Sequence, residues 1–175
     1  MITLLIILAE ISFWIFIVAG LFARYVWKRE KLSWYFFAMV PIIDLLLLLL
    51  TYFDLRAGAT ATSAHGIAAI YIGCSIAFGK QMIEWADVRF QYYVLKTGSL
   101  PKKKVGVERR KQEIKGWLKH AYAYVIGNAF LWIMIFSLGM DEQTIALFHT
   151  SQFWTFILAI DLLVSLSYII APPKA

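Results

Sequence analysis

The stretch LSWYFFAMVPIIDLLLLLLTYF, residues 32–53, decides the fold class of this chain. Asp44 is its only charged residue, and about 20 predominantly apolar residues are enough for a helix to cross the hydrocarbon core of a bilayer. Trp34 and Tyr35, near its beginning, are aromatic residues of the kind that gather at membrane–water interfaces. We therefore predict that residues 32–53 form a transmembrane helix.

Four further apolar runs have a length that suits a membrane crossing. The predicted spans are about 2–24, 32–53, 64–97 with its end extended into the cytoplasm, 117–138 and 145–170. The chain of 175 residues is 61% hydrophobic and 16% charged, whereas soluble domains are roughly half apolar and a quarter charged. The sequence thus predicts an all-α polytopic membrane protein in which residues 1–175 form a single five-helix membrane domain.

The positive charges predict how the chain is oriented. Sixteen of the 17 Lys and Arg residues fall in alternate gaps between the apolar runs, and only Arg56 falls in the others. Because basic loops stay in the cytoplasm, we predict that the N-terminus is outside and the C-terminus is cytoplasmic. The net charge of +6 would suggest nucleic acid as the partner of a soluble protein. Here the basic loops border the cytoplasmic leaflet, so we expect contacts with its anionic lipids and no nucleic-acid binding.

Four polar residues interrupt the predicted spans at depth: Glu10, Asp44, Asn128 and Asp161. Counting about 1.5 Å per residue from the predicted membrane edges places the three carboxylates roughly 12–14 Å inside. A lone carboxylate there costs about 2.5–3.5 kcal/mol on insertion scales, so each needs a proton, a hydrogen-bond partner, water or a cation. We interpret the four residues as an ion or proton pathway. The alternative is that neutral carboxyls and Asn128 hold the helices together through interhelical hydrogen bonds.

A second group of polar residues lies where the third span extends beyond the membrane: Lys80, Glu84, Asp87 and Arg89. Glu84 and Asp87 are three residues apart on a helix, so they could hold a divalent ion or accept hydrogen bonds from the basic loop that follows. Together with Arg109 and its basic neighbours, this pair would suit a lipid-modifying enzyme. The plainer interpretation is an amphipathic helix end with ordinary salt bridges.

Small residues at four-residue spacing, Ala69, Gly73 and Ala77, predict a seam along which the third span packs closely against another helix. Cys74 is the only cysteine, which excludes an internal disulfide. His65 and His149 lie near the outer surface without close helical spacing, and His120 lies on the other side of the membrane, so we expect no metal and no cofactor.

Part of the third span and its extension resembles a group of small bacterial integral membrane proteins, the YmcC-like proteins. The similar segments are HGIAAIYIG (65–73), CSIAFG (74–79) and EWADVRF (84–90), within a stretch of about a sixth of the chain, and the five-span layout is similar as well. The resemblance implies a bacterial plasma membrane location and draws attention to His65, Gly66, Gly79, Asp87 and Arg89. It implies no activity.

The sequence therefore predicts a small, multi-pass protein of the bacterial plasma membrane. We favour movement of protons, cations or a small solute through the mid-membrane carboxylates over catalysis. The alternative is a non-catalytic accessory or scaffold subunit of a larger membrane complex. Because five helices barely enclose a path, we expect a homo-oligomer or a membrane partner protein.

Overall fold

The computed structural model describes residues 2–101 and 106–170, without the side chains of Ile2, Thr3, Ile6, Glu10 and Ile169. These residues form no strand and five helices: α1 (Ile2–Tyr25), α2 (Glu30–Arg56), α3 (Ser63–Tyr93), α4 (Gly106–Leu138) and α5 (Ile145–Ile170). All five are long and apolar enough to cross a membrane. The prediction of an all-α protein with five transmembrane helices is confirmed. The side on which the termini lie stays a prediction.

The helix bounds differ from the predicted spans mainly at α3 and α4. α4 begins at Gly106 rather than near residue 117, because the charged segment before the apolar run is helical too and forms the first part of the same helix. α3 ends at Tyr93, and Lys96 just beyond it has a left-handed backbone conformation with φ of 56°. At about 1.5 Å per residue, α4 is roughly 50 Å long, which exceeds the hydrocarbon core of about 30 Å. Both helices extend toward the end of the bundle that holds residues 26–29 and 94–101, called here the basic end.

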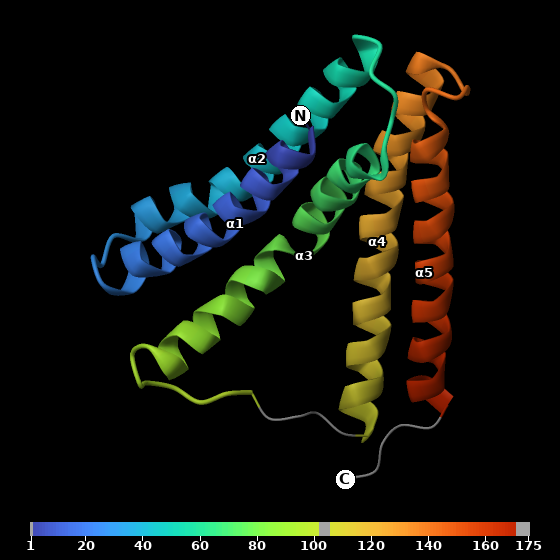
Figure 1. The fold of residues 1–175 in the computed structure, drawn as a ribbon. Helices are drawn as coiled ribbons and strands as arrows, with labels where there is room; N and C mark the ends of the chain where they lie inside the picture. Colours follow the sequence, from blue (N-terminus) through green and yellow to red (C-terminus); the bar gives the residue numbers. More distant parts are fainter. Residues whose placement is uncertain (1, 102–105, 171–175) are drawn as a thin grey trace.

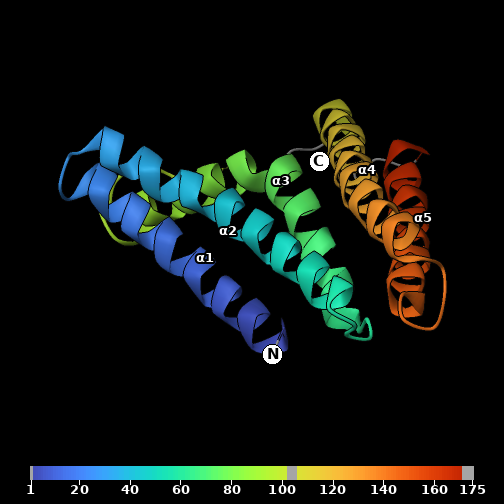
Figure 2. The ribbon, with the colours of Figure 1, turned by 90° about the horizontal axis from the view of Figure 1, so that it is seen from above.

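The helices form two hairpins with α3 between them (Figures 1 and 2). α1 pairs with α2, α4 pairs with α5, and among the described residues α1 has no contact with α4 or α5. The first half of α3 lies beside α4, whereas its second half diverges from α4 and runs beside α1 and α2 (Figure 1). α3 thus belongs to both halves of the molecule.

Glycines allow α3 and α4 to come close together. A Cβ atom placed on Gly73 would lie 2.6 Å from the carbonyl oxygen of Ala123, and one on Gly127 would lie 2.8 Å from that of Ala69. These are backbone atoms, so only residues without a side chain fit at both positions. Of the small residues that predicted this seam, Ala69 and Gly73 are buried, while Ala77 is half-buried.

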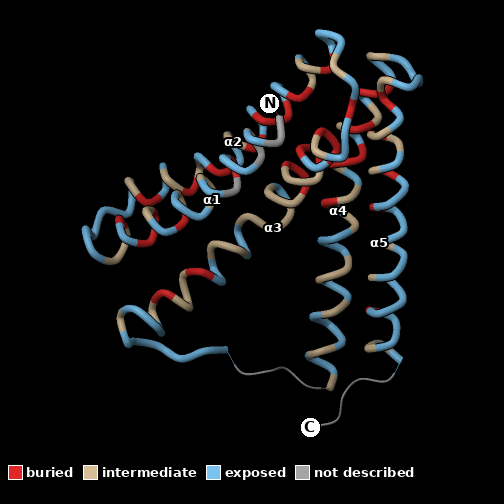
Figure 3. The backbone as a smooth tube through the Cα atoms, in the orientation of Figure 1, coloured by how far each residue is buried: buried red, intermediate tan, exposed pale blue. Residues whose placement is uncertain are grey.

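The buried core gathers mainly where α2, α3, α4 and α5 approach the opposite end of the bundle (Figure 3). There Gln143, in the turn between α4 and α5, donates from Nε2 to the carbonyl oxygens of Leu55 at 2.6 Å and Ala59 at 3.0 Å. The outer faces are apolar as well, and Phe136 and Leu163 are more than half exposed. Extensive exposed apolar surface is what a chain surrounded by lipid requires.

Candidate functional site

Three side-chain hydrogen bonds join α4 to α5 in succession, and we call them the polar ladder. They are Asn128–Ser151 at 2.5 Å, Tyr124–Thr155 at 2.7 Å and His120–Asp161 at 2.7 Å. The partners on α4 are four residues apart, which is the spacing that places side chains on one face of a helix. The ladder therefore follows the α4–α5 interface from the buried interior toward the basic end.

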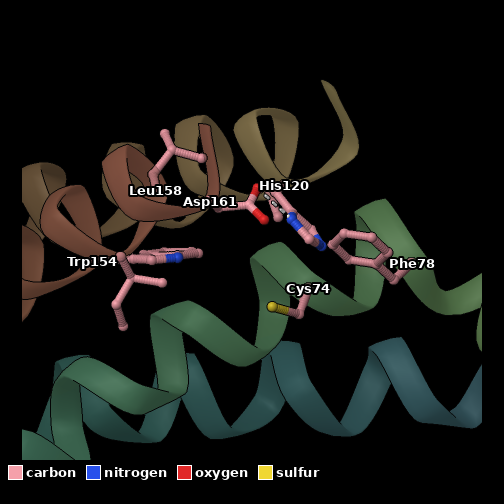
Figure 4. Close-up of a pocket in the computed structure, with 8 residues that line it drawn as sticks. Cys74, Phe78, His120, Trp154, Leu158 and Asp161 are labelled. Atoms are coloured by element: carbon pink, nitrogen blue, oxygen red, sulfur yellow. Dashed lines mark hydrogen bonds and ion pairs between the residues drawn. The ribbon is translucent and has the colours of Figure 1, made fainter. Parts of the chain in front are cut away.

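The last rung of the ladder borders a pocket of about 210 Å³ between α3, α4 and α5 (Figure 4). It is lined by Cys74, Phe78, His120, Ala123, Trp154, Ile157, Leu158 and Asp161. Nδ1 of His120 lies 2.7 Å from an oxygen of the Asp161 carboxyl group, and the imidazole lies against the Phe78 ring with a centroid distance of 5.0 Å. Most of the lining is apolar, so the imidazole and the carboxylate are the titratable groups that give this pocket its chemistry, with the Cys74 thiol beside them.

Asp44 lies on the other side of α3, between α2 and α3. Its carboxylate is buried, with 8% of the residue exposed, and no Lys or Arg of the described residues pairs with it. The Ser75 hydroxyl lies beside this carboxylate but makes no hydrogen bond of standard geometry. Cys74, next to Ser75 on α3, lines the pocket. α3 thus carries two adjacent polar residues between Asp44 and the His120–Asp161 pair.

The structure distributes the residues of the predicted pathway along the bundle. Glu10 belongs to α1, but its side chain is outside the described part of the structure. Asn128 lies ten residues before the end of α4, which is about 15 Å from the α4–α5 turn. Asp161 lies sixteen residues after the start of α5, which is about 24 Å from the same turn. Asp44 lies twelve residues before the end of α2, at about 18 Å. That these residues share one pathway stays a prediction.

His120 is the functional candidate that we did not single out from the sequence. The signal for it lies in the hairpin geometry, because residues at similar distances from the turn of an antiparallel pair face each other. His120 lies eighteen residues before the end of α4, and Asp161 lies sixteen residues after the start of α5. The short turn at residues 139–144 therefore brings His120 and Asp161 face to face. Hydropathy alone predicts no partner for this carboxylate.

The second predicted group, at the end of α3, divides into separate contacts. Asp87 accepts from Arg24 at 3.3 Å and from the Tyr25 hydroxyl at 2.9 Å, both on α1. The Arg89 guanidinium lies 3.8 Å from the centre of the Trp85 ring. Lys80 and Glu84 form an exposed ion pair at 3.9 Å. Asp87 thus ties α3 to α1, and no group of three metal-ligating side chains is found in the described ranges.

The contacts of His65, at the end of the bundle opposite the basic end, hold two helices together. Its Nδ1 accepts the backbone N–H of Thr62 at 3.1 Å, and its Nε2 lies 3.1 Å from the Asp54 carboxylate. Since Nδ1 accepts, Nε2 carries the proton and donates to Asp54. His65 therefore caps the start of α3 and joins it to the end of α2, whereas His149 contacts Gln152.

Comparison with the sequences of known proteins assigns this chain to a family. Neither a protein-family model nor a solved structure matches the chain. The chain is 51% identical over 170 residues to the uncharacterized membrane protein YmcC of Bacillus subtilis strain 168, an alignment that covers 97% of this chain and 92% of the relative. The resemblance seen in α3 thus extends over nearly the whole sequence. With five helices that can span a membrane and this identity, the chain is a multi-pass membrane protein that belongs to the YmcC family.

Proposed function

We propose that this membrane protein moves protons through the region between α3, α4 and α5, with His120, Asp161 and Asp44 as the exchanging groups. The observation that carries the proposal is the 2.7 Å contact between His120 and Asp161 at the edge of a pocket between α3, α4 and α5. An imidazole changes its charge near neutral pH. Ionisable residues inside transmembrane segments commonly mark proton or ion paths.

The nature of the partners favours protons over metal cations. An arginine beside Asp161 would hold a permanent charge, whereas a histidine can release its proton and change the charge of the pair. A cation path needs several oxygen ligands around one ion, whereas Asp44 and Asp161 lie on opposite sides of α3 and, among the described residues, have no hydrogen-bond partner in common. A proton can instead pass between groups that both donate and accept.

The other rungs of the polar ladder supply such groups. The Tyr124 and Thr155 hydroxyls are hydrogen-bonded at 2.7 Å, and Ser151 donates to Asn128 at 2.5 Å. A hydroxyl can donate one hydrogen bond while it accepts another. Among the described residues no hydrogen bond between two side chains joins one rung to the next, and Thr155 donates to the backbone oxygen of Ser151, so a relay along this row requires water molecules between the rungs. The same hydrogen bonds would also serve a purely structural purpose in holding α4 to α5, and an experiment has to separate the two.

The test is proton influx into vesicles that contain the purified protein, driven by a potassium diffusion potential and followed with a pH-sensitive dye enclosed inside. We expect the wild-type protein to admit protons, and we expect Asp161→Asn and His120→Gln each to reduce the rate at least tenfold. Glu84→Gln is the matched control, because it removes a carboxylate from the exposed pair with Lys80. The control should retain the wild-type rate.

Two results would overturn the proposal. The first is a wild-type protein that admits no more protons than empty vesicles. The second is an Asp161→Asn variant that keeps its rate while its thermal stability in detergent falls, which would assign the polar ladder to helix packing alone. Asp44→Asn distinguishes the two sides of α3, since loss of flux in this variant extends the path to α2.

A further inference from the structure

A second cavity of about 610 Å³ lies nearer the basic end, bounded by Gln81 of α3 and by the charged first half of α4. Its lining residues are Gln81, Glu108, Arg109, Lys111, Gln112, Glu113, Lys115, Gly116 and Lys119. Lys119 donates from Nζ to the side-chain oxygen of Gln81 at 2.8 Å, so one contact joins α3 to α4 at the edge of this open cavity. Lys119 precedes His120 of the first pocket, and the two spaces are therefore neighbours along α4.

The positive charge of this cavity is not balanced by its own acidic residues. Arg109 and Glu113 form an ion pair with each other. Among the described residues, no carboxylate lies within ion-pair distance of Lys111, Lys115 or Lys119. Glu108 is the remaining acid in the lining, so three lysines face one carboxylate.

The three lysines lie at intervals of four residues, on one face of α4. Ammonium groups on neighbouring turns, with Cβ atoms about 5–6 Å apart, repel one another and disfavour the helix. An anion between them removes this repulsion. A phosphate group fits best, because its oxygens accept several charge-assisted hydrogen bonds at once and lysine is a common phosphate ligand.

We propose that this cavity, which we call the lysine cavity, binds a phosphate group carried by an anionic phospholipid or by a small soluble phosphate compound. Its level along α4 suits a lipid headgroup, because Leu118, next to the last lining residue Lys119, and Tyr122, one turn further on, are more than half exposed and begin the apolar part of the helix. A headgroup that also carries a bulky cation would place a positive charge near the lysines. The cavity therefore selects net negative ligands. This proposal is independent of proton movement.

The test is native mass spectrometry of the delipidated protein in a neutral detergent, with a short-chain phosphatidylglycerol as the probe and a short-chain phosphatidylcholine as the neutral comparison. We expect one phosphatidylglycerol to bind to the wild-type protein. The triple variant Lys111→Gln, Lys115→Gln, Lys119→Gln should bind it at least tenfold more weakly. The matched control is Lys28→Gln, Arg29→Gln, Lys31→Gln, which removes three charges from the α1–α2 turn and the start of α2 at the same end of the bundle and should bind normally.

Competition distinguishes the two sources of phosphate. If glycerol 3-phosphate displaces the lipid at similar concentrations, the ligand is a soluble phosphate compound, and if it does not, the ligand is a lipid headgroup. Equal weakening in the triple variant and the control would show only a general attraction of basic residues to anionic lipid, and it would overturn the proposal. Absence of phosphatidylglycerol binding to the wild-type protein would overturn it as well.

Discussion

Substitution of Gly73 by alanine should weaken the contact between α3 and α4. The new Cβ atom would lie 2.6 Å from the carbonyl oxygen of Ala123 and 3.1 Å from the backbone nitrogen of Gly127, whereas ordinary contact begins near 3.4 Å. Relief of the first contact requires the helices to separate by about 0.8 Å. A gap of about 0.5–1 Å forfeits a quarter to a half of the dispersion energy between facing atoms. Overpacking of this kind typically costs about 1–3 kcal/mol.

Gly79 of the same helix provides the matched control, because a Cβ placed on Gly79 meets no atom within 4 Å. At that position alanine favours the helix over glycine by about 1 kcal/mol in water, and its methyl group contacts no other atom. The two variants thus make the same chemical change in one helix and differ only in what the added methyl group touches. We expect the free energy of unfolding to differ between them by about 2–4 kcal/mol.

The assay is equilibrium unfolding in mixed micelles of a mild detergent and sodium dodecyl sulfate, followed by tryptophan fluorescence and circular dichroism. The Gly73→Ala variant should unfold at a lower fraction of dodecyl sulfate than the wild-type protein, and Gly79→Ala at the same or a higher fraction. Equal midpoints for the two variants would mean that α3 and α4 do not approach as closely as the backbone distances require.

Three further predictions concern the Cys74 thiol, the contact between Asp87 and Arg24, and the orientation of the chain in the membrane. Cys74 lines the pocket, so a small thiol-specific reagent should react with it and block proton influx, while Cys74→Ala should be insensitive to the reagent; unimpeded influx after full modification would contradict this. Asp87→Asn weakens the contact with Arg24 at 3.3 Å and should lower the free energy of unfolding by up to about 1 kcal/mol, which the same micelle titration measures. In a Cys74→Ser background, an impermeant maleimide should label Thr60→Cys from outside intact cells and Ser99→Cys only after permeabilisation, and the reverse pattern would refute the predicted orientation.

For the polar residues, the sequence predicted which helices carry them but not which residues they contact. That Asp44 and Asp161 would lie within membrane-spanning helices follows from their positions inside apolar runs. Their neighbours could not be read from those runs, because an apolar helix has no polar face that marks its rotation about its own axis. The pairing of Asp161 with His120 depends on that rotation and on the length of the turn at residues 139–144.

Asp87 is a case in which local sequence left the partner open. Its spacing from Glu84 allowed a shared site on one helix as well as ordinary salt bridges, and the structure places Asp87 against Arg24 and Tyr25 of α1. Contacts between helices far apart in sequence supplied the stronger partners. A guanidinium and a hydroxyl neutralise and solvate a carboxylate, whereas a second carboxylate repels it.

The sequence by itself determined the number of helices, the apolar run that each one contains and the end of the bundle that carries the positive charge. These are properties of each segment alone, because burial of a run of about 20 apolar residues in lipid does not depend on which helix lies beside it. Only the tertiary structure decided that α3 leaves α4 to join α1, that glycines meet backbone at Gly73 and Gly127, and that His120 reaches Asp161. Lipid and protein neighbours are equally apolar, so hydropathy cannot rank them, and close packing with a few hydrogen bonds makes the choice.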